Sequence, residues 1–225
     1  ISPAIYKKIP YDALHDFAPI TLAVFTPNLL VVHPSVPAKS VKEMIALARA
    51  RPDQILYASG GTGTNSHLAM ALFVSMAQIR MVHVPYKGST PGIIDLIAGN
   101  VAVTINSVAT VVHHVRSGKL RALGVASSRR VAAVPDIPTI NEAGLPGYES
   151  VQWSGLWAPA GAPQEIIARL HRETVAVLRT PDTRERLTGD GSEVVASSPE
   201  EFAAFIKTEI VKWAAVVKAT GIAPM

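Results

Sequence analysis

Apolar residues recur along this chain with two different periods, and the period changes at turns rich in glycine, proline and hydroxyl groups. Short apolar, β-branched runs indicate strands, and longer segments with apolar residues three or four positions apart indicate helices. Strands that alternate with helices predict an α/β fold with a parallel or mixed sheet. The expected strands are 55–58, 81–84, 101–105, 120–126 and 151–157, and the expected helices are 41–51, 65–76, 91–98, 108–117, 164–178, 182–188 and 199–219.

The first 32 residues are less regular than the rest of the chain. Residues 5–12 are predicted to form a short helix followed by a loop. Residues 19–32 are rich in β-branched side chains, which favours strand, but Pro27 cannot donate a backbone hydrogen bond to a sheet. We therefore expect two strand segments with a break at residues 26–28.

Local signals mark where several helices should begin. Ser40 is followed three residues later by Glu43, which is the spacing of a capping box, and Ser198 is placed to cap the last helix. Pro91 is expected at the first position of its helix, where a missing N–H costs little. Residues 129–148 show neither period, and so long a connection is typically functional or crosses between domains.

A glycine-rich turn at residues 59–64 separates the strand 55–58 from the helix 65–76, and it holds three glycines and three hydroxyl residues. Backbone N–H groups at the start of a helix lack intrahelical partners and carry the positive end of the helix dipole. Glycine also allows another molecule to approach the bare backbone. The turn is therefore a candidate anion-binding site.

Nucleotide-binding motifs do not fit this turn. A P-loop needs lysine and then serine or threonine after its last glycine, whereas Gly63 is followed by Thr64 and Asn65. The dinucleotide motif needs a third glycine at the position of Ser66. Two alternatives remain: a small carboxylate held by N–H groups and hydroxyls, or a tight connection that binds nothing.

Two further polar turns follow strands in the same way. Residues 86–90 combine glycine with hydroxyl groups, and Asn106 and Ser107 follow the strand 101–105. Ligands of α/β sheets bind at the carboxyl ends of the strands. Three polar turns at this edge favour a binding site over a purely structural connection.

Composition narrows the classes of protein that remain. The chain has 225 residues, of which 48% are hydrophobic and 17% are charged, enough for one large or two small folded domains. No apolar run is long enough to span a bilayer. The net charge is +4, but the basic residues are scattered, so nucleic-acid binding is not expected. Cysteine is absent and the histidines lack the spacing of a zinc site, so no disulfide, metal or cofactor is expected.

An ordered set of short motifs runs over essentially the whole chain. Each motif alone is weak, but together they are specific. They are Asp16–Ile20, Pro34–Val41, Tyr57–Ser59, Gly61–Thr64, His67, Val82–Gly88, Gly118–Leu123, Pro135–Thr139, Glu142–Glu149 and Ala158–Gly161. On these residues the chain resembles the Bug (TctC-like) family, the extracytoplasmic solute receptors of tripartite tricarboxylate transporters.

The resemblance implies a type II-like periplasmic-binding-protein fold, in which two α/β lobes joined by crossing strands close on a ligand. Residues 33–152 would form the second lobe, and residues 1–32 and 153–225 part of the first. Members of the family begin with a signal peptide and several β–α units that do not occur at the start of this chain. The first lobe is therefore expected to lack its N-terminal part. Apolar surface around Trp157 and Phe202 would then be uncovered, which favours oligomerisation.

The family captures small organic anions, often di- or tricarboxylates, and the resemblance carries ligand contacts onto this sequence. The glycine-rich turn would offer its backbone N–H groups and the hydroxyls of Ser59 and Thr64. Asn106 would stand where many relatives carry aspartate, and Trp153 would touch the ligand face-on. His67 is expected to be an internal packing residue. The expected ligand-binding residues are Ser59, Gly60, Gly61, Thr62, Gly63, Thr64, Asn65, Tyr86, Lys87, Gly88, Ser89, Asn106 and Trp153.

The function implied by the resemblance is non-enzymatic. A periplasmic protein would capture a di- or tricarboxylate, or a related carboxylate, and deliver it to the membrane permease subunits of the transporter. The alternative is a ligand-sensing receptor of the same fold that passes a signal to a membrane partner. A hydrolase has the least support, because Tyr57 stands where the Gly-x-Ser-x-Gly motif around Ser59 needs glycine.

Overall fold

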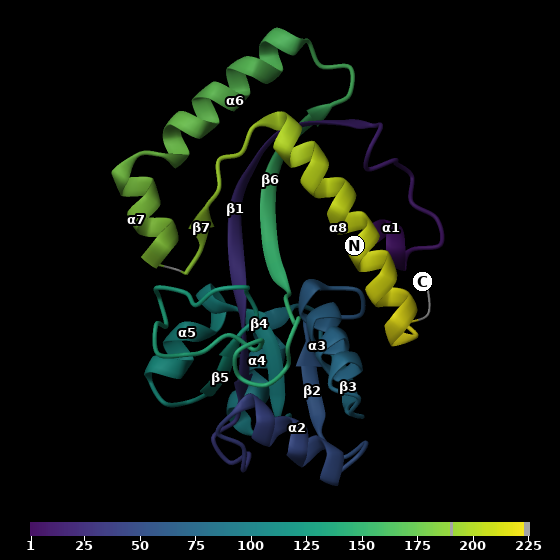
Figure 1. Ribbon diagram of the computed structural model, residues 1–225, viewed down its shortest axis with the longest axis vertical. Coiled ribbons are helices and arrows are strands. Elements are labelled where there is room, and N and C mark those ends of the chain that lie inside the picture. Colours follow the sequence, from purple (N-terminus) through teal and green to yellow (C-terminus); the bar gives the residue numbers. More distant parts are fainter. Residues whose placement is uncertain (190, 223–225) are drawn as a thin grey trace. The chain divides into compact units, whose positions relative to one another are not determined.

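The computed structural model describes residues 1–189 and 191–222, and the chain separates into two compact units. Unit 1 comprises Ile1–Thr26 and Trp153–Met225, and unit 2 comprises Pro27–Gln152 (Figure 1). Asp190 and residues 223–225, which the sequence analysis assigns to the first lobe, lie outside the described residues. The sequence-based boundary after residue 32 differs from the unit boundary after Thr26.

Unit 2 is built on a mixed sheet with the strand order β3-β2-β4-β1-β5. β2 pairs in parallel with β3 and β4, whereas β1 pairs antiparallel with β4 and β5. A mixed sheet is one of the two arrangements that the sequence predicts. The strands are β1 (Phe17–Val32), of which only the second half belongs to unit 2, β2 (Leu56–Ser59), β3 (Val82–Pro85), β4 (Val103–Ser107) and β5 (Arg121–Val125).

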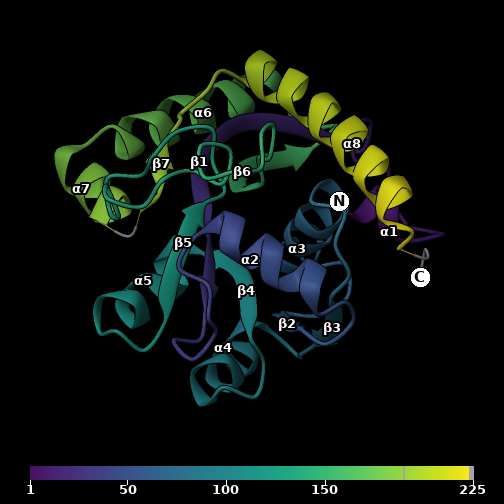
Figure 2. The same cartoon turned by 60° about the horizontal axis from the view of Figure 1, so that its bottom comes forward.

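Helices cover both faces of this sheet (Figure 2). In β1, Leu30 and Val32 belong to the core formed with α2 and α3, whereas Leu29 and Val31 belong to the core formed with α4 and α5. All four side chains are fully buried, as expected for a strand that is covered on both faces. The helices are α2 (Val41–Ala50), α3 (Asn65–Met76), α4 (Ser89–Ala98) and α5 (Val108–Arg116).

Unit 1 contains the first half of β1 and most of β6. Its long helix α8 begins with a capping box: Ser198 Oγ accepts from Glu201 N, and the Glu201 carboxylate accepts from Ser198 N. The short helix α1 packs against α8 (Figure 1). The elements are α1 (Ser2–Ile5), β6 (Val151–Pro159), α6 (Gln164–Leu178), α7 (Pro181–Gly189), β7 (Glu193–Val194) and α8 (Pro199–Thr220).

The centre of the apolar face of α8 is covered within unit 1, whereas the sequence predicts that this surface is exposed. Phe202 and Ile206 pack against Leu22 of β1, and they are 0% and 4% exposed. Trp157 is half-buried against the same cluster. Among the described residues, no helix combines the length and the apolar character that are needed to cross a membrane.

β1 runs without a break through Pro27, where the sequence predicts an interruption. The pairing with β7 ends at Phe25, and the pairing with β4 begins at Asn28. Pro27 therefore lies where the strand exchanges one set of neighbours for another, so its missing N–H is tolerated. The predicted break was wrong because the change of partners, rather than a turn, accommodates the proline.

Two helices begin two or more residues away from their predicted starts, and one strand was not predicted. α4 begins at Ser89 after Gly88, whose φ is +106°, so Pro91 is its third residue rather than its first. α1 ends before most of the predicted helix at residues 5–12. β7 has two residues and exists only through its pairing with β1.

The cap of α2 follows half of the predicted capping box. Ser40 Oγ accepts from Glu43 N at 3.2 Å, as expected. The Glu43 carboxylate, however, accepts from Lys39 N at 2.7 Å rather than from Ser40 N. The reciprocal bond thus moves by one residue, while the acidic side chain still lies in the first turn, where it suits the helix dipole.

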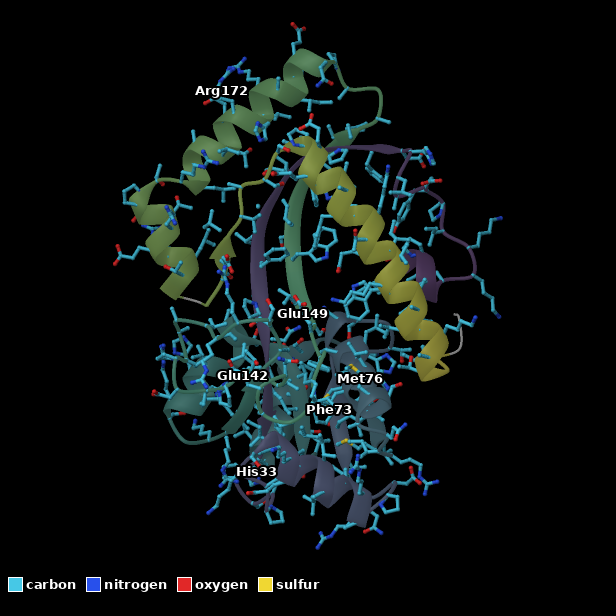
Figure 3. The ribbon with its side chains drawn as sticks, in the orientation of Figure 1. His33, Phe73, Met76, Glu142, Glu149 and Arg172 are labelled. Atoms are coloured by element: carbon cyan, nitrogen blue, oxygen red, sulfur yellow. The ribbon has the colours of Figure 1, made fainter. Side chains whose placement is uncertain are left out.

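The connection 129–148 contains no helix or strand, as predicted, but it packs tightly onto unit 2. Phe73 and Met76 lie on α3 (Figure 3). Tyr148 meets Phe73 edge to face with ring centroids 6.0 Å apart, and its hydroxyl donates to Ala69 O at 2.9 Å. The connection therefore completes the core on the α2–α3 side of the sheet.

Candidate functional site

Two helix N-termini meet at the glycine-rich turn of unit 2. The turn leads into α3, and the backbone that precedes α4 is bonded to it: Gly88 N donates to Gly60 O at 3.0 Å, and Tyr86 N donates to Ser59 O at 3.1 Å. Gly60 also lies close to Ser89, because a Cβ at residue 60 would stand 3.2 Å from Ser89 Oγ. The first turns of both helices are thereby brought together.

A cavity of about 240 Å³ lies beside these helix ends. None of its lining residues carries a charge, and two of them are glycines that leave the backbone accessible. A negative charge placed here would be met by N–H groups and side-chain dipoles rather than by an ion pair. The lining residues are Asn28, Gly60, Thr64, Asn65, Ser66, Gly88, Ser89, Asn106 and Gln152.

Several of the donors around the cavity are left available by the protein itself. α4 has no side-chain cap, because its N-cap residue is Gly88, so its first N–H groups receive no side-chain acceptor. At α3, Thr64 Oγ1 accepts from His67 N at 3.4 Å and caps only one N–H group. Asn106 Oδ1 accepts from Ser107 N at 3.0 Å, and no acceptor for Asn106 Nδ2 is found among the described residues.

Six of the expected ligand-binding residues line the cavity: Gly60, Thr64, Asn65, Gly88, Ser89 and Asn106. Gly61, Thr62 and Gly63 form the turn without lining it. The Thr64 hydroxyl donates to Gly61 O at 2.7 Å, so it stabilises the turn. Ser59 is only 2% exposed, and its hydroxyl bonds within the protein rather than pointing into the cavity.

The remaining expected residues point elsewhere. Burial, together with the hydrogen bond that the Tyr86 hydroxyl donates to Asp95 Oδ2 at 2.6 Å, raises the pKa of Tyr86 to about 12. Lys87 is exposed. Trp153 belongs to unit 1, where its Nε1 donates to Glu209 Oε2 at 2.9 Å and its ring lines a separate apolar pocket.

Asn28, Ser66 and Gln152 line the cavity but were missed from the sequence. Asn28 Nδ2 donates to Asn65 Oδ1 at 2.8 Å and to Ser150 O at 3.0 Å, so it positions the first residue of α3. A single asparagine inside a β-branched run was the available signal. Gln152 carried no local signal, because only the tertiary fold brings the start of β6 to this edge.

A second polar cluster contacts the turn from inside the protein. Ser59 Oγ lies 2.6 Å from His83 Nε2, and Gly63 N donates to His67 Nδ1 at 3.1 Å. The rings of His67 and His83 are stacked with centroids 3.9 Å apart and an angle of 7° between their planes. His67 is buried, in line with the expected packing role, whereas no pattern in the sequence indicated that His83 contacts Ser59.

The Ser59–His83 pair has the composition of a hydrolytic nucleophile and its base, but its surroundings do not support that chemistry. Burial, and secondarily the neighbouring His67, lower the pKa of His83 to about 4, which makes it a weak base at neutral pH. The Ser59 hydroxyl is buried, and no carboxylate among the described residues orients the other nitrogen of His83. The described residues also hold no group of three or more potential metal ligands.

The α/β architecture with two units is that of the periplasmic-binding-protein class, as similar solved structures show. R. palustris Rpa4515 with adipate is 35% identical, with a TM-score of 0.92 over 100% of this chain and 75% of that chain. Periplasmic binding protein BugD is 31% identical, with a TM-score of 0.90 over 100% and 76%. MatC from Rhodopseudomonas palustris with bound malate is 32% identical, with a TM-score of 0.86 over 96% and 74%.

The sequence profile of the TctC family, described as the tripartite tricarboxylate transporter family receptor, matches residues 1–222. The chain therefore belongs to the TctC family, which the motifs had indicated. A curated relative, the UPF0065 protein in the tcbD-tcbE intergenic region of Pseudomonas sp. (strain P51), is 38% identical over 209 residues. That match covers 92% of this chain and 62% of the relative, so the chain spans less than two thirds of the relative's length.

Proposed function

We propose that this protein captures a small organic carboxylate in the periplasm and delivers it to the membrane subunits of a tripartite tricarboxylate transporter. One carboxylate group of the ligand would lie in the cavity between the N-termini of α3 and α4. Backbone N–H groups of the two helices, together with Asn106 Nδ2, would donate to its oxygens. The residues proposed to surround the ligand are the nine that line the cavity.

The observation that carries this proposal is the uncapped N-terminus of α4 beside an uncharged cavity. A surface cavity without charged residues binds an anion only if oriented dipoles replace a counter-ion, and two converging helix ends supply them. Hydrogen bonds to an ionised acceptor are roughly twice as strong as neutral ones. The absence of lysine and arginine between residues 52 and 79 is consistent with this mode of binding.

The relatives support a dicarboxylate as the ligand class. Two of the similar solved structures hold adipate and malate, each of which has two carboxylates. Isothermal titration calorimetry of the full chain with adipate and malate tests the proposal, and dimethyl adipate serves as an uncharged control. Binding of the acids without binding of the ester is expected. Equal binding of acid and ester, or no binding of either acid, would contradict an anion site.

Asn106→Leu is expected to weaken dicarboxylate binding at pH 7 by about tenfold, because it removes an amide donor for which no acceptor is found among the described residues. Calorimetry measures the loss. Asn141→Leu is the matched control, because it also removes a side-chain acceptor from a backbone N–H, that of Gly147, at an exposed residue that does not line the cavity. If Asn106→Leu binds with the affinity of the parent, Asn106 does not contribute to the site.

Delivery to a transporter requires a membrane partner. The identity of this partner distinguishes a role in transport from a role in sensing. Cross-linking of the ligand-loaded protein in membranes, followed by mass spectrometry, is expected to identify permease subunits. Recovery of a sensor kinase in their place would favour the receptor alternative. Since the chain belongs to a family of transporter receptors, the transport role is the one we propose.

A further inference from the structure

The glycine-rich turn is tied to two histidines that do not line the cavity. Gly61 N donates to Ser59 Oγ at 3.1 Å, and that hydroxyl lies 2.6 Å from His83 Nε2. Gly63 N donates to His67 Nδ1 at 3.1 Å. The two glycines have φ angles of +124° and +80°, so these bonds hold the part of the turn whose conformation favours glycine.

The bond from Gly63 N depends directly on the protonation state of an imidazole ring. A backbone N–H only donates, so His67 Nδ1 is unprotonated, and the neutral ring carries its hydrogen on Nε2. The Ser59 hydroxyl accepts from Gly61 N, which leaves its own hydrogen for a neutral His83 Nε2. A protonated His83 would instead donate to Ser59 Oγ, and the hydroxyl hydrogen would turn toward Gly61 O at 3.3 Å while the oxygen still accepts from Gly61 N.

The surroundings of the stacked rings favour their neutral forms. Burial lowers the pKa of His67, and burial together with the stacked His67 lowers the pKa of His83. Tyr57 of β2 also stacks on His83, with ring centroids 4.9 Å apart, and burial raises the pKa of Tyr57 to about 12. Among the described residues of β2, β3 and α3, no carboxylate, lysine or arginine faces either histidine.

We propose that His67 and His83 are positioning residues: as neutral, stacked rings they hold the glycine-rich turn in its anion-binding conformation, and protonation of His67 releases the turn. This inference rests on the proposed function, and it adds residues outside the cavity that set the pH range in which the site is assembled. Neither ring needs to touch the ligand, because each acts through a backbone N–H of the turn.

The direction of the pH effect follows from linkage. A histidine in an unfolded chain has a pKa near 6.5, whereas burial lowers the pKa of folded His67 below that value. Below about pH 6.5 the released state therefore binds more protons, so the stability of the assembled turn falls as the pH falls. If the histidines acted only through their charge, the affinity for an anion would instead rise as the pH falls, because an imidazolium near the site would attract the anion.

Two substitutions at His67 test its Nδ1 acceptor and its aromatic ring separately. His67→Asn replaces Nδ1 with an amide oxygen that accepts from Gly63 N but does not titrate, whereas His67→Phe keeps a ring in the stack and removes the acceptor. At pH 7.5 we expect His67→Asn to bind adipate within about twofold of the parent and His67→Phe to bind about tenfold more weakly. The ratio of parent to His67→Asn affinity should fall as the pH is lowered to 4, and the protonation of adipate itself cancels in that ratio.

The outcomes separate this inference from the proposed function. If the parent binds no dicarboxylate at pH 7.5, both fail. If the parent binds and His67→Phe binds equally well, or if the parent and His67→Asn keep a constant affinity ratio down to pH 4, only the positioning role fails. Thermal unfolding of each variant at each pH shows whether the fold is retained.

A measurement on the parent protein covers the case in which His67→Phe does not fold. Imidazole ¹⁵N chemical shifts report which nitrogen carries the hydrogen, and we expect His67 to be unprotonated at Nδ1 at pH 7. As His67 titrates below its ordinary pKa of 6.5, the amide signals of Gly61 and Gly63 should change together. A histidine at position 67 that titrates near pH 6.5, without any change in those amides, would overturn the proposal.

Discussion

Replacing Gly61 with valine is expected to weaken dicarboxylate binding by about tenfold to a hundredfold. Gly61 has a φ of +124°, a conformation that β-branched residues rarely adopt, and a Cβ at this position would stand 3.0 Å from Tyr86 O. The valine must therefore distort the turn that links the two helix ends. A cost of about 1–3 kcal/mol for such a strained residue corresponds to a loss of about tenfold to a hundredfold in affinity. Calorimetry with adipate measures it.

Gly118→Val is the matched control for this prediction. Gly118 also has a positive φ, +72°, but no atom lies within 4 Å of a Cβ built there, and it lies outside the turn and the cavity. The control should show backbone strain as a lower melting temperature while it retains the affinity of the parent. If Gly61→Val binds adipate as tightly as the parent does, the turn is only a connection and the carboxylate is held elsewhere.

Phe202→Ala is expected to reduce the free energy of unfolding by about 3–5 kcal/mol, because it leaves a large cavity in a small core. Phe202 is fully buried and packs edge to face against Trp157, with ring centroids 4.9 Å apart, and against Trp153, at 5.7 Å. Its ring also lies directly over Gly155, where any Cβ would overlap it. Chemical denaturation of the full chain, followed by tryptophan fluorescence, measures the loss.

Phe205→Ala on the same helix is the control, because Phe205 is only half-buried and its truncation should cost clearly less. Gly155→Ala tests the contact from the other side: overpacking should cost about 1–3 kcal/mol in the parent and less in the Phe202→Ala background. Equal losses for Phe202→Ala and Phe205→Ala would mean that Phe202 does not organise the core of unit 1.

Patterns among neighbouring residues predicted the bounds of the strand and the helix around the site to within about one residue. The predicted strand 55–58 and helix 65–76 correspond to β2 (Leu56–Ser59) and α3 (Asn65–Met76). Ser198 caps α8 because its partner lies only three residues away. Boundaries of this kind are set by hydrogen bonds between near neighbours, and such bonds can be inferred from the order of residues alone.

The candidate site was predicted where it depends on those local elements. Gly60, Thr64 and Asn65 flank a helix start, and a helix start supplies donors in any fold. The expected roles of the Ser59 and Thr64 hydroxyls were less accurate, because both hydroxyls bond to the protein itself. A sequence shows that a hydroxyl is present, but the surrounding packing decides where it points.

Taken by itself, the sequence determined the α/β class, the polar turns at strand ends and the family. Only the tertiary structure decided that β1 continues through Pro27, that Asn28 and Gln152 share a cavity, and that His83 contacts Ser59. The last contact joins residues 24 positions apart, and it exists because β2 and β3 pair in parallel with Tyr57 opposite His83. Strand register and the choice of neighbouring strand depend on the burial of the whole sheet, so no local pattern encodes them.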